Sequence, residues 1–258
     1  MRDVHVLAAS ILAVFVAYCV WWATNDPHHL SFWTKAKTHN FLKTDPDGYM
    51  HRLTKADLSA RKAASNDDYI YWSAHSAPAE FSELEKYKLK QACRRADAFF
   101  ASIRTETPYF HKHNSKLPWV FARVTGAYYE GGLPHTRRDA IFLTDGAMSR
   151  SLKELTELVV HERIHVLQRQ FPKETRTLLE EIGFKHVGKK SDYLCARANP
   201  DIDDNVYSHP QMREGKPWVA CYTSDHPTSI QDVTNGDEFE HPFEYMAYTV
   251  SRRVGTST

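Results

Sequence analysis

The sequence lacks an excess of charge of either sign. Its 258 residues include 33 Lys plus Arg against 32 Asp plus Glu, which gives a formal net charge of +1. Nucleic-acid binding usually depends on a basic face or stripe, and the two basic pairs, Arg137-Arg138 and Lys189-Lys190, are too short to form one. We therefore expect no nucleic-acid partner. The length is typical of one domain, with or without appendages.

Cysteine is also scarce. One of the four cysteines, Cys19, lies in the hydrophobic N-terminus, and Cys93, Cys195 and Cys221 are widely spaced with no CxxC pair. This pattern is neither a disulfide framework nor a thiolate zinc site. Unbridged cysteines are the favoured interpretation, with a Cys195–Cys221 bridge in an oxidising compartment as the alternative. The chain lacks an Asn-x-Ser/Thr sequon, so glycosylation does not indicate a compartment.

One long hydrophobic run stands at the N-terminus. Residues 5–23 carry no formal charge apart from the titratable His5, and the run ends in Trp21-Trp22. A helix of about 18–20 apolar residues crosses a bilayer, and tryptophan suits the interface. We therefore predict that residues 1–24 form a single-pass membrane anchor, with residues 4–23 in the membrane and the side of the domain undetermined. A cleaved signal peptide is the alternative, disfavoured because no small-residue cleavage pair follows the run.

The rest of the chain divides into two parts. Residues 25–50 carry turn signals and are predicted as a stalk, and residues 51–258 are predicted as one α+β domain with a small mixed sheet. Helices are expected where apolar residues recur at helical spacing after a capping residue, and strands where short β-rich runs lie between turn residues. The expected helices are 54–64, 78–103, 151–171, 173–184 and one opening at Pro242, and the expected strands are 119–124, 140–144 and 217–222.

The motif that carries chemistry is His161-Glu162-Arg163-Ile164-His165, inside the predicted helix 151–171. Histidines at i and i+4 lie on one helix face, so both imidazoles can reach one ion. Neutral imidazole nitrogens hold Zn²⁺ at about 2.0–2.1 Å and leave a position open for water. Glu162 is rotated by about 100° from His161, where it can take a proton from that water without being a ligand.

With the preceding strand 140–144, this helix resembles the zincin superfamily of zinc metallopeptidases. The resemblance implies that His161 and His165 are zinc ligands and that Glu162 is the general base. It covers about a third of the chain. The zincin consensus has uncharged residues between the glutamate and the second histidine, whereas this chain has Arg163.

The third ligand distinguishes subclasses of zincins. Metzincins extend the motif to HExxHxxGxxH, but Gln168 and Phe171 occupy those positions here. Gluzincins use a glutamate from a later helix, which makes Glu244 the favoured third ligand because a carboxylate near an apolar helix face is costly unless it is paired or bound to a metal. The alternatives are His241, Glu238, Glu240 and Asp201.

Several other residues are candidates for supporting roles. Glu157, one turn before His161, could accept a hydrogen bond from that imidazole, although an ordinary solvent-facing glutamate is equally consistent with the sequence. Tyrosine and histidine side chains near the motif could donate to a developing oxyanion, with packing as the alternative for each tyrosine. These candidates are Tyr248, Tyr207, His209 and Tyr245. The acidic residues of 199–204 could bind calcium, although turn formation explains them more often.

Taken together, these patterns predict a membrane-anchored zinc metallopeptidase that hydrolyses a peptide or protein substrate. The zincin resemblance implies that the substrate extends along an edge strand at Ala140–Thr144. Two alternatives stay open. The domain could be a zinc-binding scaffold in which Arg163 disturbs the active helix, or a membrane-tethered interaction protein with a fortuitous motif.

Overall fold

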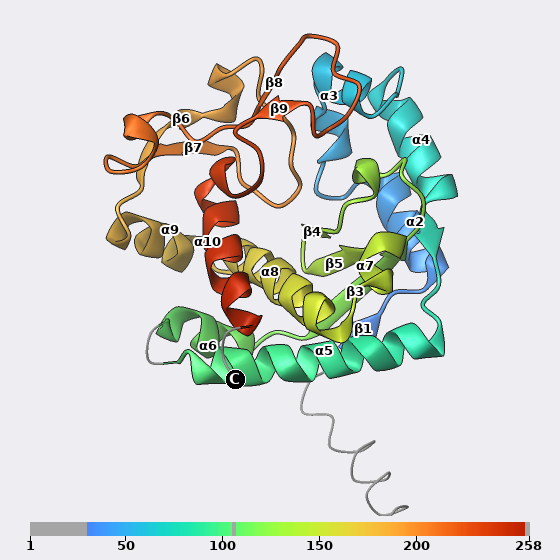
Figure 1. The fold of residues 1–258 in the computed structure, drawn as a ribbon. Coiled ribbons are helices and arrows are strands. Elements are labelled where there is room, and N and C mark those ends of the chain that lie inside the picture. Colours follow the sequence, from blue (N-terminus) through green and yellow to red (C-terminus); the bar gives the residue numbers. More distant parts are fainter. Residues whose placement is uncertain (1–29, 105–106, 256–258) are drawn as a thin grey trace, which may run out of the picture. The chain divides into compact units, whose positions relative to one another are not determined.

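The computed structural model describes residues 30–104 and 107–255, and Ser31–Thr258 form one compact unit. The fold is α+β with a small mixed sheet, which confirms that part of the prediction (Figure 1). The principal elements, in chain order, are β1 (Leu30–Phe32), α2 (Lys35–Thr44), α3 (Lys55–Ala60), α4 (Asn66–Ser76), β2 (Pro78–Ala79), α5 (Glu83–Ser102), α6 (Pro108–Asn114), β3 (Trp119–Val124), β4 (His135–Arg137), β5 (Ala140–Leu143), α7 (Asp145–Ser149), α8 (Leu152–Gln170), α9 (Pro172–Glu181), β6 (Lys185–Lys189), β7 (Asn205–Ser208), β8 (Cys221–Tyr222), β9 (Val233–Thr234) and α10 (Pro242–Ser251). Short 3₁₀ turns, η1 (Met50–Arg52), η2 (Glu130–Gly132), η3 (Lys190–Asp192), η4 (Arg213–Gly215), η5 (Asp237–Phe239) and η6 (Arg252–Gly255), lie between and after them.

The main sheet has the strand order β1-β3-β5-β4, with β2 also paired to β3. β3 and β5 are parallel, whereas β4 is antiparallel to β5 and β2 is antiparallel to β3. The turn between β4 and β5 is a tight one, with Arg138 in the left-handed region at φ 54°. Two small two-stranded sheets, β6-β7 and β8-β9, follow later in the chain.

Helices lie against both faces of the main sheet. On one face, Val120, Ala122 and Phe142 join the buried residues of α2 and α4 in a hydrophobic core. Strand side chains alternate between faces, and on the opposite face Trp119 lies against Arg163 of α8, 4.5 Å from the guanidinium carbon to the ring centroid. α8 also contacts α5 and α10 (Figure 1). The helix that carries the histidine motif is therefore held between the sheet and α10.

The predicted edge strand is not an edge. β5 is paired on both sides, by β3 and by β4, so β4 is the outer strand. The outward backbone groups of β4 are also occupied, because the N–H of Thr136 donates to Asp201 at 2.6 Å and its carbonyl accepts from Arg169 at 3.0 Å. A substrate therefore cannot add as a strand to Ala140–Thr144, and the expected alignment along it is wrong.

The expected membrane anchor is corrected as well. Within residues 30–104 and 107–255, no helix is both long enough and apolar enough to cross a membrane. The segment predicted as the anchor, residues 1–24, lies outside the described residues. A single-pass membrane localisation is thus not supported by the described residues.

Most of the segment predicted as a stalk belongs to the folded domain. Residues 25–29 lie outside the described residues, but residues 35–44 form α2, and Trp33, Leu42 and Met50 are buried in the core beside the sheet. The turn signal at Asp45 ends α2 in the left-handed conformation at φ 41°. Its carboxylate then binds the buried Arg137 of β4, which ties this segment to the sheet.

Several predicted boundaries also shift. The capping box at Thr54 is present with Asp57, as predicted. The helix expected from Pro78 begins instead after Ser82, whose side chain accepts from the Glu85 N–H, because Pro78 pairs with Val124 of β3. Of the predicted strand 217–222, only Cys221–Tyr222 is a strand. The other predicted helices and strands lie within a few residues of their predicted positions, whereas elements such as α4, α6, β4, β6 and β7 were not predicted.

A disulfide joins Cys195 to Cys221, which corrects the expectation of unbridged cysteines. Backbone hydrogen bonds flank it, from Tyr222 N–H to the Cys195 carbonyl at 2.8 Å and from Arg197 N–H to the Ala220 carbonyl at 2.9 Å. The bridge closes a segment with a sequence separation of 26 residues. It therefore anchors the start of the loop at residues 195–204 to β8.

Candidate metal centre

Two helices carry the side chains of the candidate site. α8 begins after Ser151 because the Ser151 hydroxyl accepts from the Glu154 N–H at 3.3 Å, while the Glu154 carboxylate accepts from the Ser151 N–H at 2.8 Å. The helix then runs for 19 residues, with His161 and His165 one turn apart on one face. His165 has no exposed surface and His161 is half-buried.

α10 supplies the carboxylate. His241 caps its start, because the ring Nδ1 accepts from the Phe243 N–H at 3.1 Å, and Pro242 occupies the first helical position. Glu244 therefore lies in the first turn, where it is 6% exposed, and α10 packs against α8. The contact between the two helices brings Glu244 next to the histidines, which are 79 and 83 residues earlier in the chain.

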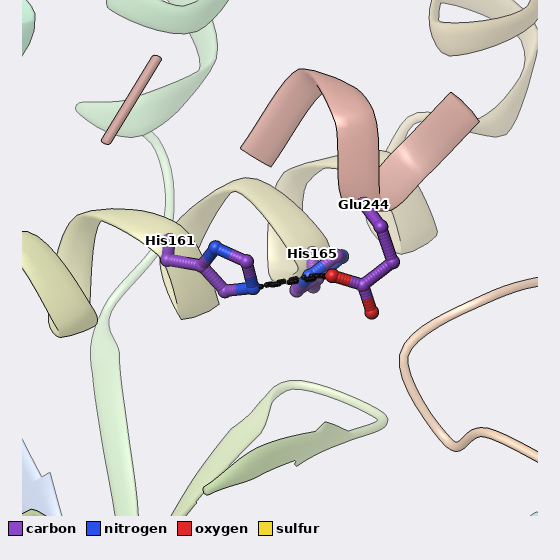
Figure 2. Close-up of side chains that lie close together, drawn as sticks. All are labelled: His161, His165 and Glu244. Carbon is purple, nitrogen blue, oxygen red and sulfur yellow. Dashed lines mark hydrogen bonds and ion pairs between the residues drawn. The ribbon is translucent and has the colours of Figure 1, made fainter. Parts of the chain in front are cut away.

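The three candidate ligand atoms converge on one point, as Figure 2 shows. His161 Nε2 lies 3.1 Å from His165 Nε2, and Glu244 Oε2 lies 3.3 Å from the first and 3.5 Å from the second. Tetrahedral ligands at about 2.0–2.1 Å from zinc are about 3.3–3.4 Å from one another. The observed spacings therefore match three corners of a zinc site, and in the part of the chain that the structure describes this is the one such group.

The orientation of His165 is set by Gln168. The Gln168 amide nitrogen donates to the Phe243 carbonyl of α10 at 3.1 Å, so its Oε1 must be the atom that faces His165 Nδ1 at 2.9 Å. Since an amide oxygen can only accept, Nδ1 carries the proton and Nε2 is directed at the cluster. Such a partner on the far nitrogen is the usual way in which proteins orient a metal-binding imidazole.

The electrostatics of the group suit a cation. Burial would raise the pKa of Glu244, but the charge on His165 and the hydrogen bonds from both imidazoles hold it well below its usual range. Burial lowers the pKa of His161. For His165, burial acts in the same direction, but the charge of Glu244 outweighs it and raises the pKa to about 9. The Glu244 carboxylate thus stabilises a positive charge on the His165 imidazole. A metal ion bound by these residues would put a positive charge in the same place.

Glu162 lies beside this group. It is 2% exposed, and its Oε2 accepts from the Thr136 hydroxyl of β4 at 3.0 Å. Burial first, and then the nearby charge of Asp201, raises the pKa of Glu162 well above its ordinary value. Burial likewise raises the pKa of Asp201 to about 7. A buried carboxyl group that readily holds a proton therefore stands next to the candidate ligands.

A cavity of about 540 Å³ opens onto the site. Its wall includes His161, Glu162 and Glu244, together with Glu157 and Tyr248. The Tyr248 ring lies against His161 at 4.6 Å between centroids, whereas Glu157 is half-buried and makes no hydrogen bond to His161. Tyr248 thus stays a candidate for contact with a bound molecule, and the expected hydrogen bond from His161 to Glu157 is absent from the described structure.

The alternative third ligands have other partners. Glu240 pairs with Arg197, Glu238 pairs with Arg252, and Asp201 accepts from the Thr136 N–H. His241 uses its Nδ1 as the helix cap, and its Nε2 lies 3.2 Å from the Asn205 carbonyl and 3.3 Å from Asp203. Of the candidates considered, Glu244 alone faces the histidines.

The other supporting candidates lie away from the site. His209 contacts the Ile182 carbonyl, Tyr245 packs on Phe184 and Trp218, and Tyr207 stacks edge-on against His241. None of the three lines the cavity at the site. The acidic residues at 199–204 form turn and loop hydrogen bonds, such as that from the Asn205 N–H to Asp203 at 2.9 Å, in place of a calcium cage.

Arg163 points away from the candidate metal centre. Its guanidinium is buried against the loop after α6, where it donates to the carbonyls of Asn114, Leu117 and Pro118 and to the Asn114 side chain, and it lies over the Trp119 ring. Two positions after His161 on a helix is nearly the opposite face. The departure from the zincin consensus is thus a packing feature that joins α8 to the loop before β3.

Three residues were not predicted to take part in the metal centre: Thr136, Gln168 and Asn199. Gln168 stands three residues after His165, so helical spacing could have identified it. Asn199 donates to Glu244 Oε1 at 3.0 Å, and Thr136 holds Glu162, but both contacts cross long stretches of chain and leave no local signal.

Searches against protein-family models, characterised proteins and solved structures found no match to this chain.

Proposed function

We propose that this protein is a zinc-dependent hydrolase of the metallopeptidase type. The observation that carries the proposal is the tetrahedral spacing of His161 Nε2, His165 Nε2 and Glu244 Oε2, with Glu162 in the wall of the same cavity. Two imidazoles and one carboxylate are a common ligand set of catalytic zinc sites, which keep a fourth position for water or substrate. A bound zinc ion would act as a Lewis acid and bring the pKa of water near 7.

Glu162 is the residue that moves the proton in this mechanism. Its carboxylate takes a proton from the attacking water and returns it to the leaving nitrogen as the peptide bond breaks. Thr136 holds Oε2 of Glu162 by a hydrogen bond, and Glu162 forms part of the cavity wall. Burial raises the pKa of Glu162 in the described structure. A cation held by His161, His165 and Glu244 would lower it again, which would let the Glu162 carboxylate act as the base.

Other residues of the cavity wall bind and orient the substrate. Tyr248, whose ring lies against His161 in the cavity wall, would donate its hydroxyl to the oxygen that gains charge during attack. β5 is paired on both sides, and the outward backbone N–H and carbonyl of Thr136 in β4 are already hydrogen-bonded. The peptide would therefore lie in the cavity between β4, α8 and the loop at 197–201, without adding a strand to the sheet. The position of Arg163 away from the ligands weighs against a scaffold whose active helix is disturbed by that residue.

The test compares Glu162→Gln with Glu244→Gln in the full chain. We expect about one zinc per wild-type chain by elemental analysis, and chelator-sensitive cleavage of a fluorogenic peptide library. Glu162→Gln should keep its zinc and lose turnover by about 10²–10⁴-fold or more, because the proton acceptor is gone. Glu244→Gln should lose both zinc and activity, because it removes a ligand.

The outcomes separate the alternatives. A wild-type chain that folds without zinc would leave only the interaction-protein interpretation. Stoichiometric zinc with no cleavage of any peptide would favour the zinc-binding scaffold. Full activity of Glu162→Gln would exclude the proton transfer assigned to it.

A further inference from the structure

The Asn199 side chain makes three hydrogen bonds beside the candidate metal centre. Its Oδ1 accepts from the Asp201 backbone N–H at 2.8 Å. Its Nδ2 donates to Glu244 Oε1 and to Glu240 Oε2, both at 3.0 Å. Because a backbone N–H can only donate, the atom that faces it must be the amide oxygen, and the amide nitrogen must face the two carboxylates.

The two carboxylates would otherwise repel each other. Glu240 is 1% exposed and lies two residues before α10, whereas Glu244 is 6% exposed and lies in the first turn of α10. Arg197 balances the charge of Glu240 through a two-pronged contact, with Nε at 3.2 Å from Oε1 and Nη2 also bonded to Oε2. Glu244 is faced instead by the two imidazoles, and only on its Oε2 side. The amide nitrogen of Asn199 lies between the two carboxylates and donates one hydrogen bond to each, so Glu244 Oε1 accepts one of them.

This contact also decides which oxygen of Glu244 is available. With Oε1 held by Asn199, Oε2 is the atom that lies 3.3 Å and 3.5 Å from the histidine nitrogens. A glutamate side chain has several rotatable bonds, and fixing the carboxylate before metal binding removes the entropy cost of ordering it later. Asn199 therefore orients the Glu244 carboxylate by a hydrogen bond to Oε1, just as Gln168 orients the His165 ring by a hydrogen bond from Nδ1.

The backbone around Asn199 is fixed on both sides. Before it, the Ala198 N–H donates to Asp57 at 2.7 Å and the Ala198 carbonyl accepts from Arg61 at 3.1 Å. After it, Asp201 accepts from the Thr136 N–H of β4 at 2.6 Å. The amide group is thus presented by a loop that is anchored to α3 and to the main sheet, in addition to the disulfide at Cys195.

We propose that Asn199 is a positioning residue that holds Glu244 in its metal-binding orientation. This inference rests on the proposed metal centre, and it adds a residue that neither the histidine motif nor its spacing identifies. The positioning role requires a side chain at 199 that donates hydrogen bonds. A side chain of the same size without N–H donors should not orient Glu244. Asn199→Asp keeps the shape, removes both N–H donors and places a third carboxylate beside Glu240 and Glu244.

The test measures zinc affinity by competition with a chromophoric chelator, on full chains whose folding is checked by circular dichroism. We expect Asn199→Asp to weaken zinc binding by about 10–100-fold, the range typical of groups that orient metal ligands. The matched control is Asn66→Asp, since Asn66 also donates through Nδ2 to two acceptors, the Met50 and Leu53 carbonyls, away from the site. The control should keep the wild-type zinc affinity.

A second measurement separates positioning from a loss of stability. In the Co²⁺-loaded protein, Asn199→Asp should change the visible absorption of the tetrahedral ion, whereas Asn66→Asp should not. If Asn199→Asp does not fold, Asn199→Ala, which adds no charge, decides the matter by the same two measurements. Wild-type zinc affinity and an unchanged Co²⁺ spectrum in the Asn199 variants would overturn the positioning role alone. A wild-type chain that binds no zinc would overturn the metal centre itself, which is a different result.

Discussion

Replacing Arg163 by methionine should destabilise the fold and leave the candidate metal centre intact. The guanidinium is 1% exposed and makes four hydrogen bonds to the residues of 114–118. All four acceptors are neutral amide or peptide oxygens, and burial lowers the pKa of Arg163 to about 10. Arg163 thus remains charged at neutral pH, and three backbone carbonyls of the loop depend on it.

The magnitude follows from two opposing contributions. Hydrogen bonds from a charged donor contribute about 1.5 kcal/mol each at the low end, so loss of four costs about 6 kcal/mol. Methionine also removes the cost of burying the charge, which lowers the pKa of Arg163 and is on the order of 3 kcal/mol for an ion in a protein interior. The free energy of unfolding should therefore fall by about 3 kcal/mol.

The assay is urea denaturation of the metal-free proteins, with Arg176→Met as the control because Arg176 is exposed on α9. The control should change the free energy of unfolding by less than about 0.5 kcal/mol. Zinc affinity of the folded Arg163→Met protein should stay within about threefold of wild type, since the guanidinium faces away from His161. A stability change below about 1 kcal/mol, or a tenfold loss of zinc affinity, would refute this account and revive a direct influence of Arg163 on the site.

Two further perturbations test other parts of the structure. Replacing both Cys195 and Cys221 by serine should lower the free energy of unfolding by about 3.5 kcal/mol, the chain-entropy estimate for a separation of 26 residues; an unchanged urea midpoint would show that the bridge does not constrain the unfolded chain. Burial lowers the pKa of His135 to about 4, with Glu130 opposing it, so the unfolded state binds the extra proton between pH 6.5 and 4. The associated stability is complete above about pH 6.5 and is lost as the pH falls toward 4, a change of about 3 kcal/mol. The His135→Asn variant should show a shallower fall of stability over that window, and an identical slope would contradict the assignment.

The helix and the motif could be predicted from the sequence because their signals are local. Ser151 and Glu154 mark the start of α8, the apolar spacing marks its length, and the separation of His161 from His165 places both rings on one face. The same reasoning gave α3, with its cap at Thr54, and the start of α10 at Pro242. Each of these features depends on residues within one or two helical turns.

The identity of the third ligand was predictable only as a preference. The sequence favours Glu244 because it lies near an apolar helix face, but it leaves His241, Glu238, Glu240 and Asp201 as alternatives. Packing of α10 on α8 brings Glu244 within 3.5 Å of both histidine nitrogens and gives the other candidates different partners. No spacing rule links residues about 80 positions apart.

Tertiary structure alone decided the roles of buried polar groups. The sequence shows Arg163 as a departure from the zincin consensus, and the fold shows that its guanidinium bonds to the loop before β3. The sequence shows a run of acidic residues near Asn199, and only the fold shows that the Asn199 amide donates a hydrogen bond to Glu244. It shows β-rich residues at 140–143, but pairing with β4 and β3 makes them an interior strand. A helix cap or a helical stripe is set by neighbours in the chain, whereas a buried donor or acceptor is satisfied by whichever group the packing of distant segments brings within about 3 Å.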